Sequence, residues 1–102
     1  MNIQNHGTPV SVTAAGTATA SCLISGTTDK LIFVTDISAS SSGTMGTWAV
    51  LVGTSPIWQG SGVVNYEFSE PLRVTKGQGV SLYANGTTAT YVSMSGFYVT
   101  VS

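Results

Sequence analysis

Apolar and polar residues alternate along most of the chain, and no helical stripe of apolar residues appears. The clearest alternation runs over residues 64–68. Related runs occupy residues 10–14, 18–24, 30–39, 46–53, 57–59, 72–74, 80–84 and 88–101. Because successive side chains of a strand point to opposite faces, each run predicts a β-strand with one buried face.

Glycine, proline, serine and asparagine residues separate these runs, as is typical of turns. The Asn85-Gly86 pair predicts a two-residue hairpin turn, since both residues tolerate a positive φ. Such a turn would pair residue 83 with residue 88 and place Tyr83 on the same face as Val92. Eight or nine short strands at this spacing indicate one all-β domain over residues 9–102, either a sandwich or a barrel. Residues 1–8 lack strand patterning, and we expect them to form an N-terminal arm.

The last predicted strand carries apolar residues at both parities. One parity contains Tyr91, Phe97, Val99 and Val101, and the other contains Val92, Met94 and Tyr98. Either Gly96 carries a bulge that exchanges the two faces, or both faces are covered. A strand covered on both faces needs a partner outside the core. We therefore expect an interface between subunits at Tyr83, Val92, Met94 and Tyr98.

Composition narrows the possible partners. Charged residues make up 7% of the chain and hydrophobic residues 42%, with a formal net charge of −1, so disorder is not expected. Three Lys and Arg residues cannot form the basic stripe that nucleic acids or anionic membranes require. No apolar run reaches the ~20 residues of a membrane span. Residues 1–7 do not resemble a signal peptide, so we expect synthesis in a cytoplasm. The single cysteine, Cys22, is in phase with Ala20 and Ile24 and is predicted to be buried.

The residues that carry chemistry are few and scattered, so we expect neither an enzyme nor a metal or cofactor site. His6 is the only histidine, and with Ile3 it is assigned to contacts of the arm with a neighbour. Glu67 and Glu70 would face opposite sides of a continuous strand, which disfavours a pair of catalytic carboxylates. Trp58 follows a proline turn, so it is the candidate for an aromatic anchor of a binding surface; the alternative is that it packs in the core.

The second half of the chain carries three motifs in order: residues 68–74 (FSEPLRV), 77–83 (GQGVSLY) and 91–98 (YVSMSGFY). This order resembles the small β-sandwich head-decoration, or cement, proteins of tailed bacteriophages over about residues 30–101. It is also similar to jelly rolls of the tumour-necrosis-factor type, which form trimers. The resemblance implies an antiparallel jelly roll or β-sandwich of about eight strands.

The resemblance also implies a function in assembly. The protein would be a homotrimer that binds the major capsid protein on the outer surface of the virion and stabilises the shell. The main alternative is a carbohydrate- or receptor-binding jelly roll, such as a fibre tip. An enzyme that borrows catalytic residues from a neighbouring subunit is a third possibility.

Overall fold

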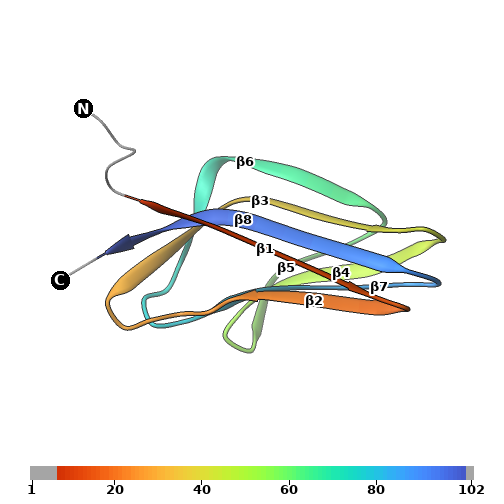
Figure 1. Ribbon diagram of the computed structural model, residues 1–102, viewed down its shortest axis with the longest axis horizontal. Coiled ribbons are helices and arrows are strands. Elements are labelled where there is room, and N and C mark those ends of the chain that lie inside the picture. Colours follow the sequence, from red (N-terminus) through yellow and green to blue (C-terminus); the bar gives the residue numbers. More distant parts are fainter. Residues whose placement is uncertain (1–6, 101–102) are drawn as a thin grey trace.

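The computed structural model describes residues 7–100 as two β-sheets packed face to face (Figure 1). Its strands are β1 (Thr8–Gly16), β2 (Thr19–Ile24), β3 (Lys30–Ser41), β4 (Met45–Val52), β5 (Ser55–Ser61), β6 (Val64–Val74), β7 (Val80–Gly86) and β8 (Thr90–Thr100). In the described part of the chain, no helix has the length and apolar character needed to cross a membrane.

The strand order identifies the topology. Sheet A has the order β1-β8-β3-β6, and sheet B has the order β2-β7-β4-β5. All neighbouring strands are antiparallel. Every two strands that follow each other along the chain lie in different sheets, except β4 and β5, as in a jelly roll of two interleaved Greek keys. The predicted fold class, an antiparallel jelly roll of eight strands, is therefore confirmed.

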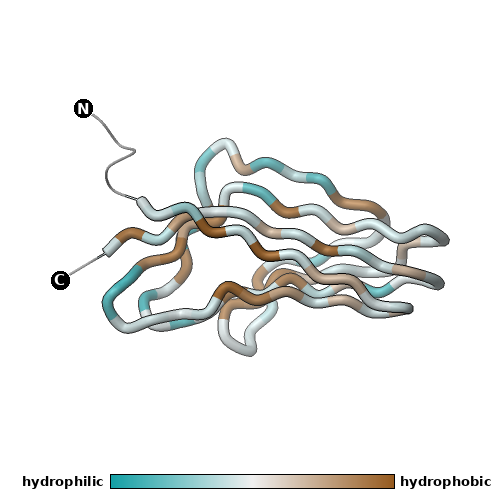
Figure 2. Tube along the Cα trace, in the orientation of Figure 1, coloured by the Kyte–Doolittle hydropathy of each residue, from teal (hydrophilic) through white to brown (hydrophobic). Residues whose placement is uncertain are grey.

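The core lies between the two sheets and follows the alternation of the sequence. Every second residue of a strand points inward, so apolar positions recur along each trace (Figure 2). Val34, Val50, Val74, Val80 and Leu82 are completely buried there. Small and β-branched side chains dominate this core, which suits two sheets packed closely face to face.

The strand β8 keeps one register along its whole length, which settles the ambiguity over Gly96. Its pairing with β1 is continuous from Thr8↔Tyr98 to Gly16↔Thr90. The irregularity lies instead in β3, where Thr35 is an extra residue opposite β8 and donates its hydroxyl to the Ser95 carbonyl at 3.1 Å. Because β8 does not change face, its even-numbered residues all point inward.

Two predicted interface residues are corrected by this register. Val92 and Met94 are buried in the core, so the prediction that they form an interface is wrong. Tyr98 also points inward and is half-buried, and its hydroxyl donates to the Ser25 carbonyl at 3.1 Å. The outward residues of β8 are those of the other parity, including Tyr91 and Phe97.

The predicted hairpin at Asn85-Gly86 is also wrong. The strands β7 and β8 lie in different sheets, so their connection crosses the sandwich. The Gly86 amide donates to the Ala18 carbonyl at 2.7 Å, and the Asn85 side chain bonds to Thr47 in β4. Tyr83 consequently lies on the outer face of sheet B, whereas Val92 lies in the core.

Candidate binding surfaces

The charged residues are confined to one part of the molecule. They are Asp29, Lys30, Asp36, Glu67, Glu70, Arg73 and Lys76. Five of these lie on the neighbouring strands β3 and β6, and the other two lie in the turns next to them. The strands β1 and β8 and all four strands of sheet B contain no charged residue. Both outer faces of the sandwich therefore offer large neutral areas, and the strands of sheet B contain no charged residue at all.

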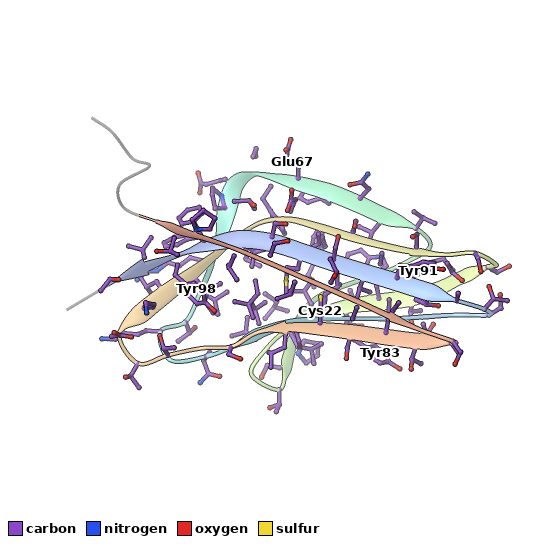
Figure 3. All side chains as sticks on the ribbon, in the orientation of Figure 1. Cys22, Glu67, Tyr83, Tyr91 and Tyr98 are labelled. Carbon is purple, nitrogen blue, oxygen red and sulfur yellow. The ribbon has the colours of Figure 1, made fainter. Side chains whose placement is uncertain are left out.

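A hollow opens on the outer face of sheet B. The register places Ser21, Tyr83, Ala49 and Gln59 in one row across β2, β7, β4 and β5. Tyr83 is 41% exposed, and Figure 3 shows its ring on the outer side of the sheet. The hollow has a volume of about 1020 Å³, and the small Ala49 lies between Tyr83 and Gln59 in its lining.

The two ends of this hollow differ in character. Leu23, Leu51 and Pro56 form one row beyond Tyr83, joined by the hydroxyl of Ser81. Toward the other end lie the hydroxyls of Thr47 and Ser61.

Hydrogen bonds to Asn85 fix the polar end. The Thr47 amide donates to Asn85 Oδ1 at 2.9 Å, and Asn85 Nδ2 donates to Thr47 Oγ1 at 3.2 Å. The oxygen of the Thr47 hydroxyl therefore accepts a hydrogen bond from within the protein, which leaves the hydroxyl proton available for a hydrogen bond to a ligand.

The outer face of sheet A carries a second, smaller hollow around Tyr91, which is 49% exposed. Its lining includes hydroxyls, and Ser38 Oγ and Ser93 Oγ lie 2.6 Å apart. Further along the same face, the rings of Phe33 and Phe97 stack with their centroids 5.2 Å apart. This face therefore combines aromatic rings with neutral hydroxyls.

Cys22 lies between the sheets and is buried, as the sequence predicted (Figure 3). Burial raises the pKa of its thiol from 9.0 to about 11, and a hydrogen bond with the Leu82 backbone opposes this rise only in part. The thiol is thus neutral at physiological pH and contributes as a small apolar side chain.

Trp58, the candidate anchor, packs in a cluster of aromatic rings. Trp58 is half-buried, and its ring lies 5.0 Å from that of Trp48, 5.1 Å from that of Tyr66 and 5.6 Å from that of Phe68. Tyr66, at 43% exposure, is the more accessible ring of β6.

Of the other predicted site residues, Ile3 and His6 lie outside the described residues, and Tyr83 is exposed at the sheet B hollow. The alternation of β4 does place Ala49 opposite to the buried Trp48. Its position beside Tyr83 and Gln59 depends on the pairing of strands distant in sequence, which alternation does not reveal. Within residues 7–100, no group of three or more His, Cys, Asp or Glu side chains is placed to hold a metal ion.

Comparison with protein-family models gives no match, and comparison with curated proteins gives none either. Among solved structures, the chain is similar to the insecticidal delta-endotoxin Cry8Ea1 from Bacillus thuringiensis, with a TM-score of 0.42 and 15% sequence identity. The similarity covers 92% of this chain but 20% of the toxin chain.

Proposed function

We propose that this jelly roll is a decoration, or cement, subunit of a virion. It assembles with copies of itself, as a homotrimer, on the outer surface of a phage head and stabilises the shell by binding the major capsid protein. The resemblance of residues 30–101 to head-decoration proteins supports this assignment, and the jelly-roll topology is compatible with it.

The observation that carries the proposal is the absence of charge from six of the eight strands. The centres of protein interfaces are depleted of charged residues and enriched in aromatic ones, because burying an unpaired charge is costly. Here exposed tyrosines lie among small hydroxyl side chains on both faces. Such faces can be buried against a partner without a large desolvation cost.

We assign shell binding to the outer face of sheet A. This face combines Tyr91 with the stacked Phe33 and Phe97 rings. Gly7, which precedes β1, lies close to the Phe97 ring, so the chain enters the domain beside this face. Tyrosine and other aromatic residues are enriched at binding hot spots, which makes Tyr91 the expected anchor.

The test uses heads from the phage that encodes the chain, stripped of decoration and mixed with the purified protein. We expect the protein to sediment with the heads, and Tyr91→Ala to weaken this binding by about tenfold or more. Tyr83→Ala, a matched change on the opposite sheet, should bind like the wild type. If the wild-type protein does not bind the heads, the assignment is wrong.

A separate measurement tests self-association. Light scattering should give a particle mass three times that of the 10.5 kDa chain. Association is a common source of stability for a domain of this size. A stable monomer at micromolar concentration would contradict the trimer but would leave binding to the shell to be judged by sedimentation.

A further inference from the structure

We propose that the hollow on the outer face of sheet B is a binding site for a neutral saccharide, with Tyr83 and Gln59 as its two walls. This site lies on the sheet opposite to the one assigned to shell binding, so the proposal goes beyond the assembly function. Three features of the hollow favour such a ligand: the spacing of the row, the chemistry of its side chains and the absence of charge.

The spacing suits a single sugar ring. Tyr83 in β7 and Gln59 in β5 are separated by one strand, β4, and Ala49 occupies the position between them. Neighbouring strands lie about 4.8 Å apart, so the two walls stand roughly 10 Å apart at the backbone. Because the Ala49 side chain is a single methyl group, the space between the walls stays open. A ligand can rest on this floor while both walls contact it.

The side chains around the floor match the two faces of a sugar. The exposed ring of Tyr83 offers a flat apolar surface for the C–H groups of a pyranose. The Gln59 amide can donate to one hydroxyl and accept from another. The Thr47 hydroxyl, whose oxygen already accepts a hydrogen bond from Asn85, can donate its own proton to a ligand at the hollow's polar end.

The electrostatic character of the face favours a neutral ligand. No charged side chain lines the hollow, and none occurs in the four strands of sheet B. An anionic sugar would lose part of its hydration here without gaining a cationic partner, which costs free energy. Neutral hydroxyls, in contrast, can exchange water for the amide and hydroxyl groups of the lining.

The shape argues for a small ligand over a second copy of the chain. Interface cores pack about as densely as protein interiors, so two closely apposed surfaces leave little empty space. A hollow of about 1020 Å³ facing a flat sheet would leave unfilled volume between the two surfaces. A saccharide can fill this volume while its outer hydroxyls remain in water.

The experiment begins with the labelled full chain on an array of neutral, sialylated and sulfated glycans. We expect binding to neutral glycans, and titration calorimetry with the strongest neutral ligand gives the affinity. Tyr83→Ala and Gln59→Ala should each weaken this affinity by about tenfold or more. Tyr91→Ala, which removes a similarly exposed tyrosine from sheet A, should leave this affinity unchanged.

A further variant tests whether the ligand occupies the space above Ala49. Ala49→Leu adds bulk to the floor without removing any ligand contact, so it should abolish binding while the thermal unfolding temperature shows that the domain remains folded. The proposal is overturned if no neutral glycan binds, if sialylated or sulfated glycans bind better, or if Tyr91→Ala is as harmful as Tyr83→Ala. It is also overturned if Tyr83→Ala lowers the particle mass, because the occupant would then be a second copy. Shell binding is measured separately through Tyr91, so the two proposals can fail independently.

Discussion

At the scale of single residues, Gly96 lies where the β8 backbone leaves no space for a side chain beside β3. A Cβ atom at this position would clash with the carbonyl oxygen of Phe33 and lie 3.0 Å from the Cα atom of Val34. Both contacts are with backbone, which cannot move without disturbing the sheet. We expect Gly96→Ala to lower the free energy of unfolding by about 2 kcal/mol or more, as overpacking does. Urea unfolding followed by circular dichroism measures this change.

The neighbouring Ser95 provides the control for Gly96. Its side chain makes one long hydrogen bond, 3.4 Å from Ser95 Oγ to Ser11 Oγ. Ser95→Ala should therefore lower the free energy of unfolding by less than about 1 kcal/mol. Equal effects of the two substitutions would show that the close approach at Gly96 is not what limits this position.

Cys22 gives a second prediction at this scale, concerning reactivity. Because burial raises the thiol pKa from 9.0 to about 11, the thiolate fraction at pH 8 falls by about 100-fold relative to the unfolded chain. We expect Ellman's reagent to modify the folded protein at least that much more slowly than the urea-unfolded protein. Rapid modification of the folded protein would contradict the buried placement.

The same shift predicts a dependence of stability on pH. A group whose folded-state pKa is raised favours the folded state fully below its unfolded pKa, and this contribution is lost as the pH rises through the folded value. For Cys22 the loss occurs between about pH 9 and about pH 11. Cys22→Ala should remove this part of the decline in the free energy of unfolding.

At the scale of elements, an aromatic cluster joins the two sheets along the edge formed by β5 and β6. These strands belong to different sheets, so no ladder of hydrogen bonds connects them. Trp58 of β5 instead packs edge-on against Tyr66 and at a tilt against Phe68, both from β6. Trp58→Ala should lower the free energy of unfolding by about 3 kcal/mol, since it removes the central ring. Tyr66→Phe keeps the aromatic ring of residue 66, so it should change the free energy of unfolding by less than about 0.5 kcal/mol. Denaturant unfolding compares both variants with the wild type.

The elements also show why some features could be predicted from the sequence and others could not. Alternation identified the strands and the burial of Cys22, because a residue's face depends only on its own strand. The β7–β8 connection was predicted wrongly, because Asn85-Gly86 fits a local turn while the two strands belong to different sheets. The row of Tyr83, Ala49 and Gln59 depends on two pairings between strands and on their registers. These pairings are set by packing of the whole core, so local patterning contains little information about them.

At the scale of the whole molecule, the two outer faces of the sandwich differ in shape and in their distance from charge. Sheet A presents aromatic rings and hydroxyls beside the charged strand β6, whereas sheet B is free of charge and hollowed around Tyr83. Opposite faces of one sandwich can bind two partners at once without competing. A subunit fixed to a shell through sheet A would therefore leave the sheet B hollow open to solvent.

The distribution of charge leads to the last prediction, which concerns salt. Between about 0.01 M and about 1 M salt the Debye length falls from about 30 Å to about 3 Å, so contacts between exposed charges are progressively screened. Because β1 and β8 carry no charge, attachment through sheet A should rest on apolar burial and neutral hydrogen bonds. We expect the affinity for stripped heads to change by less than about threefold over this range. Sedimentation of heads with labelled protein measures this affinity. Thr13→Lys, which adds one charge to the exposed surface of β1, should weaken binding at every salt concentration, since the new charge would be buried without a partner. A steep fall in wild-type affinity with salt would show that the charged residues of β3 and β6 dominate attachment. This result would contradict attachment by apolar burial and neutral hydrogen bonds.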